Sequence, residues 1–396
     1  MAVSLGYPPA KDQYRNLFQK TGYRVLLFLS FSTQTIADMV AVTIPILALS
    51  LHASPFEIGL LATSRGAVYA ICPFIAGYAL GKADRRQVLV SATAIDLVTT
   101  LLFYFSRAPL ELIVFRLFEG LALAIFWPTL ESLIAKARVS DNSDPLRGFN
   151  ISWGLGQMVG PIIAGAVMMF FDVRLPFLVV AVAAVANVTL IVRYGESKDQ
   201  MLNHKDRPSV SIRGISASLI LAIAFLGVIA SIFFAFFPVF VTVLGINAFE
   251  LGIMLFLFGA ARVCFFHKAR SIKGGLSPRI LLASLGFTLV YFGDRLALYA
   301  GVVVIAAAFS LVYSYTLEHV LRGDDLSVRH RAGMFEGLLG IGSMVGPFLA
   351  GFIAEFSFAY TFIMVAVVSL FFAIVLRVSE TSTHRLSLSF KLRDPD

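Results

Sequence analysis

Cysteine, histidine and charged residues are scarce in this chain of 396 residues. It contains two Cys and six His, and only 14% of its residues are Asp, Glu, Lys or Arg. About a quarter of the residues in a soluble domain are charged, so this composition argues against a water-soluble fold. Both cysteines, Cys72 and Cys264, lie in apolar runs, which argues against a disulfide framework.

The sequence also lacks the motifs of the common catalytic and ATP-driven classes. Its histidines show no His-Glu-x-x-His spacing, its cysteines form no metal-binding pair, and no Walker loop is present. We therefore expect neither an enzyme nor an ATP-driven pump, and no cofactor or metal site. The net charge of +8 is explained by basic loops beside anionic lipid, so we expect no nucleic-acid partner.

Long apolar runs dominate instead, since 58% of the residues are hydrophobic. A helix needs about 20 apolar residues to cross the hydrocarbon of a bilayer. The sequence predicts an all-α membrane protein with twelve transmembrane helices, surrounded by lipid. The ninth is the weakest prediction, because only 280–292 is continuously apolar. The predicted spans are 23–50, 57–81, 87–106, 111–135, 147–171, 174–194, 214–244, 249–266, 279–293, 297–321, 333–355 and 359–378.

Basic residues distinguish the two sides of this predicted protein. If the N-terminus is cytoplasmic, most of the 32 Lys and Arg fall in cytoplasmic segments, and the outer loops hold only Arg107, Arg174 and Arg295. This asymmetry is the positive-inside pattern. We therefore expect a multi-pass protein of the plasma or inner membrane, monomeric, with both termini in the cytoplasm.

Two segments half a chain apart are near-copies of each other. Residues 154–167 read GLGQMVGPIIAGAV, and residues 340–353 read GIGSMVGPFLAGFI. Each contains a Gly-x-x-x-Gly spacing, which lets helices approach closely. We interpret six of their residues as hinge and packing elements: Gly156, Gly160, Pro161, Gly342, Gly346 and Pro347.

The duplication predicts two pseudo-symmetric six-helix halves. The first half is expected at 1–194 and the second at 214–396, which ends in a short cytoplasmic tail. The polar stretch 195–213 is expected to form a cytoplasmic linker, because it is too short to be a domain.

Several motifs resemble those of the major facilitator superfamily, in the order in which that family carries them. The segment 77–86 is similar to the family's cytoplasmic signature loop, although Gly81 stands at the usual Asp position and Asp84 at the usual second Gly. The Arg116-x-x-x-Gly120 spacing resembles the family's second motif.

Two further motifs resemble the drug:proton antiporters of that family. Residues 156–165 are similar to their fifth-helix motif, with Ala166 where a second Gly is common, and Asp38 followed by Pro45 is similar to their first-helix pattern. The resemblance covers essentially the whole chain. It implies a secondary transporter whose halves rock about a central cavity and expose a small-molecule substrate to each side in turn.

Ionisable residues at membrane depth are costly, so they are candidates for function. A carboxyl group that alternates between an arginine partner and the cavity can release and rebind a proton. We expect proton-coupled export of small organic, amphipathic or cationic compounds; static ion pairs between helices are the alternative role for these residues. The candidate proton and substrate residues are Asp38, Gln34, Asp96, Arg116, Glu119, Trp127, Arg65, Tyr69 and Arg262.

Two other functions remain open. Arg65 and Arg262 lie in corresponding helices of the two halves, and paired arginines facing a cavity would suit transport of an organic or inorganic anion. A channel or a transporter-like sensor is a minor alternative.

Charged residues at the cytoplasmic helix ends suggest a gate that closes when opposite charges meet. Solvated helix-end pairs with little energetic effect are the alternative. The candidate gate residues are Arg85, Arg86, Glu131, Arg138 and Glu318.

Overall fold

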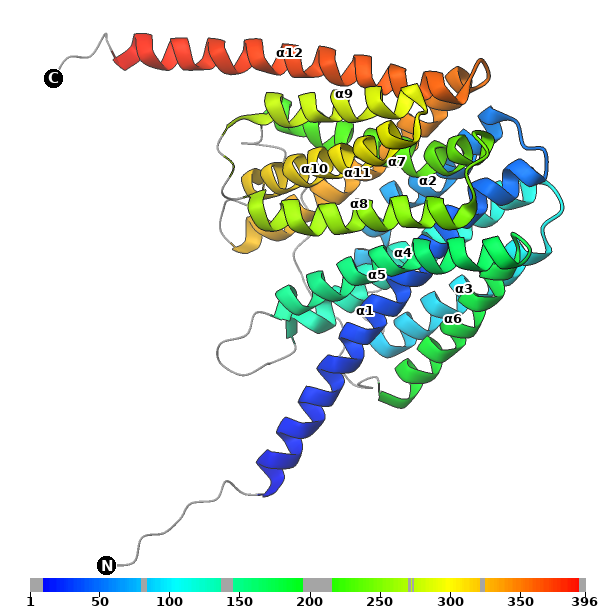
Figure 1. Cartoon of the computed structure of the whole chain (residues 1–396). Helices are drawn as coiled ribbons and strands as arrows, with labels where there is room; N and C mark the ends of the chain where they lie inside the picture. Colours follow the sequence, from blue (N-terminus) through cyan, green and yellow to red (C-terminus); the bar gives the residue numbers. More distant parts are fainter. Residues whose placement is uncertain are drawn as a thin grey trace, which may run out of the picture.

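The computed structural model describes residues 10–79, 84–136, 145–194, 216–269, 272, 274–320 and 325–391. Within these residues the chain forms twelve α-helices and no strand (Figure 1). The helices are α1 (Ala10–Ser50), α2 (Pro55–Ala79), α3 (Arg85–Phe105), α4 (Pro109–Lys136), α5 (Pro145–Phe170), α6 (Leu175–Tyr194), α7 (Ala217–Val243), α8 (Ala248–Lys268), α9 (Leu276–Phe292), α10 (Arg295–Val320), α11 (Asp325–Ala354) and α12 (Phe358–Lys391).

The helices have the length and composition of membrane spans. Among the described residues, nine helices are long and apolar enough to cross a bilayer. Helix α9 is a shorter apolar helix of 17 residues, as its short apolar run predicts. The other two, α2 and α4, carry ionisable residues such as Arg65 and Arg116. The predicted all-α membrane fold with twelve helices is confirmed.

The two halves of the chain repeat the same helix packing. In the first half, α1 packs on α5, α2 on α4, and α3 on both α4 and α6. In the second half, α7 packs on α11, α8 on α10, and α9 on both α10 and α12. The halves meet where α2 packs on α11 and where α5 lies beside α8 (Figure 1).

The duplicated glycines seat helices against each other inside each half. A Cβ placed on Gly156 would lie 2.5 Å from the carbonyl oxygen of Phe31 in α1. At the equivalent position in the second half, a Cβ on Gly342 would lie 1.9 Å from the carbonyl oxygen of Ala224 in α7. Only glycine permits backbones to approach this closely. The Gly-x-x-x-Gly spacing therefore builds the α1–α5 pair and the α7–α11 pair.

Aromatic contacts join the two halves at one end of the bundle, which we call the closed end. Phe56, at the start of α2, packs on Phe348 and Phe352 of α11 at centroid distances of 5.7 and 4.4 Å. Its backbone N–H donates a 2.8 Å hydrogen bond to Glu355. The first turn of α1 and the last turn of α12 project from the opposite end (Figure 1).

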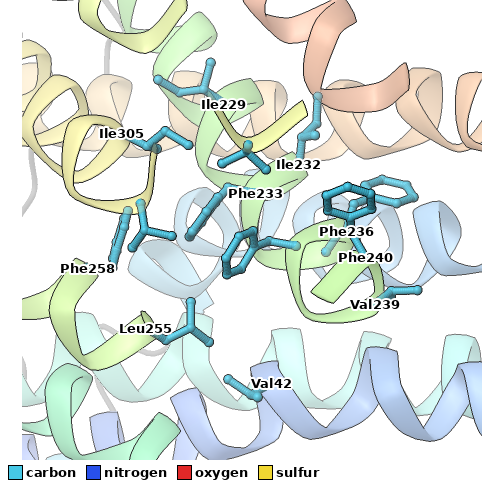
Figure 2. Packing of buried hydrophobic residues seen from close by; sticks show 14 of the residues in the cluster. Val42, Ile229, Ile232, Phe233, Phe236, Val239, Phe240, Leu255, Phe258 and Ile305 are labelled. Atoms are coloured by element: carbon cyan, nitrogen blue, oxygen red, sulfur yellow. The ribbon is translucent and has the colours of Figure 1, made fainter. Parts of the chain in front are cut away.

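The second half has a densely aromatic core. The ring of Phe233 in α7 stacks on Phe237 at 4.8 Å and on Phe258 of α8 at 5.0 Å. Figure 2 shows Phe233, Phe258 and Leu255 converging from these two helices, with Val42 of α1 nearby. These ring contacts join α8 to α7 and so help to position α8, which carries Arg262.

Buried charge is divided unequally between the halves. Among the described residues, the buried acids Asp38, Asp96 and Glu119 all belong to the first half. The buried charged residues of the second half are Arg262 and Arg279. An interaction between buried opposite charges across the interface therefore has to pair an acid of the first half with an arginine of the second.

Candidate transport site

A buried polar stripe runs along α1. The side-chain amide of Gln34 donates a 2.7 Å hydrogen bond to Oδ2 of Asp38, one turn further along the helix. Each residue is only 8% exposed. A Cβ on Gly160 of α5 would lie 3.0 Å from the Cβ of Asp38, so α5 covers this stripe closely. The structure thus brings together two of the residues predicted for the cavity.

Arg262 of α8 reaches from the second half to the first. Its Nη1 donates a 2.6 Å hydrogen bond to Oε1 of Gln157 in α5. The arginine is 4% exposed, and its Nε has no hydrogen-bond partner among the residues that the structure describes. A buried guanidinium group with unused donors is costly unless an acceptor satisfies it.

Aromatic rings surround the same guanidinium group. Its central carbon lies 4.3 Å from the ring centroid of Phe309, and 5.2 Å from the centroids of both Trp153 and Phe266. These distances are within the range of cation–π attraction. The guanidinium group therefore lies in a largely aromatic environment, in which few groups can accept its hydrogen bonds.

Asp38 interacts electrostatically with both Arg65 and Arg262. Arg65 is half-buried and forms no hydrogen bond or ion pair within the described part of the chain. We call Asp38, Arg65, Gln157 and Arg262 the central site. It combines side chains from α1, α2, α5 and α8, and therefore from both halves.

A second cluster of charges lies inside the first half. Arg116 and Glu119, one turn apart on α4, form a buried ion pair between Nη1 and Oε2. Asp96 of α3 interacts electrostatically with Glu119 and with Arg65. Arg65 thus lies within electrostatic range of acids in both clusters.

A small internal cavity adjoins Asp96. It has room for about one water molecule and is also lined by the polar residues Thr33, Thr93 and Asn187. The Asn187 amide donates a 3.4 Å hydrogen bond to the Thr33 hydroxyl, and its Oδ1 has no partner in the described part of the chain. In the described part of the chain, no group of three or more His, Cys, Asp or Glu residues could hold a metal ion.

The predicted gate residues are placed only in part. Arg85 is buried, and Arg86 donates a hydrogen bond to the carbonyl of Val192. Glu131 of α4 is exposed, as is Glu318 of α10. Arg138 and the expected linker 195–213 lie outside the described residues, so their roles stay predictions.

Glu131 has a counterpart that the sequence did not suggest. It interacts electrostatically with Glu336 of α11, in the other half. Tyr69 of α2 and Tyr313 of α10 lie within electrostatic range of both acids. Two carboxyl groups of like charge therefore approach each other across the interface, flanked by two tyrosines.

Trp127, another predicted cavity residue, packs in the core of the first half. It makes edge-on contacts with Phe126 at 5.5 Å and with Phe149 at 6.2 Å. Its exposure is 9%. In this structure Trp127 supports the helices that carry the charges.

The residue of the central site that sequence reasoning missed is Gln157. A signal existed, because Gln157 lies inside the duplicated segment at a position where the second copy has Ser343. Among the positions at which the two copies differ, this is the one with polar side chains, and such a difference marks a position that the two halves can use differently. Trp153 and Phe309 could not be chosen among the 37 Phe and two Trp by sequence alone.

Comparison with known proteins agrees with this architecture. A family model described as Major Facilitator Superfamily matches residues 26–322. The chain belongs to the major facilitator superfamily. The resemblance of its motifs to that family is confirmed, and it is a secondary transporter of the membrane.

Relatives of this transporter include proteins of bacteria and archaea. An uncharacterised transporter of the superfamily from Methanocaldococcus jannaschii is 22% identical, covering 84% of this chain and 90% of its own. The proton-coupled antiporter flippase LtaA of Staphylococcus haemolyticus is 25% identical, covering 72% and 75%. The multidrug efflux protein YfmO of Bacillus subtilis is 30% identical, but over only 35% of each chain.

Solved structures share the fold. The nucleoside transporter NupG superposes with a TM-score of 0.74 at 17% identity, covering 90% of this chain and 98% of its own. A bacterial homologue of the lysosomal transporter Spinster, in an inward-facing and unoccupied conformation, gives 0.73 at 13% identity, covering 93% and 96%.

Proposed function

We propose that this transporter is a proton-coupled antiporter that exports small organic, amphipathic or cationic compounds by alternating access. The observation that carries the proposal is the position of Asp38, a buried acid at the interface of the halves with an arginine of each half in electrostatic range. Two relatives lend support: LtaA is a proton-coupled antiporter flippase, and YfmO is a multidrug efflux protein.

The charge balance of the central site explains why proton and substrate would exclude each other. Ionised Asp38 offsets part of the positive charge of Arg65 and Arg262. Protonation removes that negative charge, and the two guanidinium groups then repel a cationic or donor-rich substrate. Substrate binds the deprotonated site and a proton expels it, which is the competition that antiport requires.

Breaking contacts between the halves completes the cycle. The hydrogen bond from Arg262 to Gln157 and the contacts of α2 with α11 connect the two halves in the present conformation. Rocking of one half against the other has to exchange such contacts between the two ends of the bundle. A change of charge at Asp38 acts directly on Arg262, and therefore on one of these contacts.

Transport in proteoliposomes tests this function. Vesicles containing the purified protein and a fluorescent organic cation such as ethidium should release or accumulate it according to an imposed pH gradient. Asp38→Asn has the charge of the protonated site, so it should abolish the response to the gradient and also weaken exchange of the cation without a gradient. Asp172→Asn, at an exposed position of the α5–α6 connection, is the matched control and should behave like the unmodified protein.

A second function is favoured by one observation, the absence of any hydrogen bond or ion pair to Arg65 within the described residues. Such an arginine is available to a carboxylate or phosphate, as an anion transporter requires. If Asp38→Asn is silent while Arg65→Gln and Arg262→Gln abolish uptake of an anion, the antiport proposal is wrong. Counterflow that saturates with substrate separates either carrier from a channel.

A further inference from the structure

Arg262 makes less use of its hydrogen-bonding capacity than its burial demands. A guanidinium group carries five N–H donors. Arg262 is only 4% exposed. Within the described residues its side chain donates one hydrogen bond to another side chain, that of Gln157, and its Nε has no partner. Leaving a buried donor unpaired is destabilising, and more so for a charged group. The guanidinium group of Arg262 can therefore bind a further hydrogen-bond acceptor.

The geometry restricts where that acceptor can bind. The guanidinium carbon lies 4.3 Å from the ring centroid of Phe309 and 5.2 Å from those of Trp153 and Phe266. These rings occupy space around the group, and hydrogen bonds to a guanidinium group form in its plane, at its N–H edges. The edge at Nη1 is already occupied by the side-chain oxygen of Gln157. That oxygen is an uncharged amide carbonyl.

We propose that Gln157 stands in for the substrate, and that an uncharged carbonyl oxygen of the substrate replaces the Gln157 oxygen on Arg262. This inference rests on the proposed antiport. It adds to it a chemical class: amphipathic compounds that present an amide, ester or ketone oxygen beside an apolar body. Trp153 and Phe309 provide apolar surface next to the acceptor position.

Electrostatics favour an uncharged acceptor over an oxyanion. A substrate oxyanion would compete with ionised Asp38 for Arg262 and so favour protonation of Asp38, which couples proton and substrate in the same direction. A carbonyl that replaces the Gln157 carbonyl adds no negative charge at Arg262, so it does not favour protonation of Asp38. The competition with the proton then comes from the cationic or donor groups of the same substrate, which ionised Asp38 attracts and protonated Asp38 does not.

The exchange also explains why Gln157 has to be released during transport. Its bond to Arg262 joins α5 to α8, and hence the two halves. Once a substrate oxygen occupies the guanidinium, Gln157 no longer holds α5 in place. Gln157 is a positioning residue in this scheme, since it orients Arg262 and yields its place to the ligand.

Binding of three matched probes tests the inference. N-methyl-4-butylbenzamide carries an uncharged acceptor, 4-butylbenzoate an oxyanion, and 4-butylbenzylammonium no acceptor. The chain has only two Trp, so Trp127→Phe leaves Trp153 as the sole indole reporter beside Arg262. Titrations use the full chain in detergent, without a gradient, and follow Trp153 emission.

The benzamide is expected to bind saturably and at least several-fold more tightly than either other probe. Arg262→Gln should weaken its binding by roughly 10-fold or more, the loss of one hydrogen bond to a charged group. Gln157→Ala removes the competing oxygen and should tighten binding by about 3- to 10-fold. Gln157→Glu places a carboxylate on Arg262 and should abolish binding. Ser343→Ala, at the equivalent position of the other half, should change nothing.

Any one of three results would overturn the inference. The first is that all three probes bind with equal affinity, and the second is that the benzoate binds far more tightly than the benzamide. The third is that Gln157→Ala weakens binding of the benzamide as much as Arg262→Gln does. If Arg262→Gln does not fold, Arg262→Lys and the Gln157 variants decide, because a lysine lacks the planar fork. Failure of the proposed antiport can be distinguished from failure of this inference. If the benzamide binds through Arg262 but a pH gradient drives no flux, the proton coupling is refuted while the binding site is supported.

Discussion

Gly59 of α2 faces the carbonyl oxygen of Pro347 in α11 so closely that a Cβ on Gly59 would lie 2.5 Å from that oxygen. The same relationship recurs in the other half, where a Cβ on Gly252 of α8 would lie 2.7 Å from the carbonyl oxygen of Pro161 in α5. The proline of each duplicated Gly-Pro pair therefore meets a glycine of the opposite half. The glycine before it packs within its own half.

Gly59→Ala and Gly252→Ala should each loosen the junction between the halves. Overpacking of this kind costs about 1–3 kcal/mol. We expect a lower melting temperature in detergent and slower substrate exchange in proteoliposomes. Gly154→Ala in α5 is the control, because among the described residues outside its own helix the nearest atom to its Cβ is a Val263 methyl at 3.4 Å, an ordinary contact. Unchanged melting and exchange in both variants would show that the halves do not need this close approach.

Removing one partner of the Arg116–Glu119 pair should destabilise the protein more than removing both. Glu119→Leu leaves a buried guanidinium without its counter-charge, at a cost of about 3–5 kcal/mol. The double variant Arg116→Met/Glu119→Leu should recover most of that loss, measured by denaturation in detergent. Glu111→Gln, at an exposed position of the same helix, is the control. A double variant as unstable as the single one would contradict a mainly structural pair.

The cavity beside Asp96 should contain a water molecule bound to Asn187 Oδ1. Asn187→Leu removes the polar group and fills part of the space, so we expect a loss of about 1–3 kcal/mol in stability, since the Thr33 hydroxyl and Asp96 lose their polar neighbour. Thr189→Val, at an exposed position of the same helix, should be neutral. A stabilised Asn187→Leu protein would indicate that the cavity is dry.

Acidification should bring α4 and α11 closer together. Glu131 and Glu336 repel each other when both are ionised. Protonation at low pH removes that repulsion, so closure is favoured as the pH falls and opposed as it rises. Distances between spin labels on α4 and α11 should therefore shorten on acidification, after replacement of Cys72 and Cys264.

Glu131→Gln/Glu336→Gln should make those distances short and independent of pH. Glu318→Gln, at an exposed position of α10, should leave the response intact and serves as the control. A response to pH that survives in the double variant would place the sensing groups elsewhere.

Much of the fold could be predicted because membrane helices are encoded locally. Each span needs an apolar run, and the short run at 280–292 became the short helix α9. Contacts one turn apart follow from helix periodicity, so Gln34 with Asp38 and Arg116 with Glu119 were within reach of sequence reasoning.

The duplicated segments also predicted more than topology. Because the two segments are offset by half the chain, Gly156 of α5 packs against α1 in the same way that Gly342 of α11 packs against α7. Which residues of the two copies would touch the opposite half was not predictable, since Gly-x-x-x-Gly serves packing within a half and between halves equally well.

The sequence by itself determined the membrane environment, the helices, the two halves and the family. The tertiary structure alone decided which polar groups interact across the halves. Arg262 donates to Gln157, 105 positions earlier in the chain, and Glu131 lies within electrostatic range of Glu336. Hydropathy and periodicity act over one or two helical turns, whereas these interactions depend on how α5 packs on α8 and on where α4 lies relative to α11. No local pattern records that arrangement, because it results from the packing of all twelve helices.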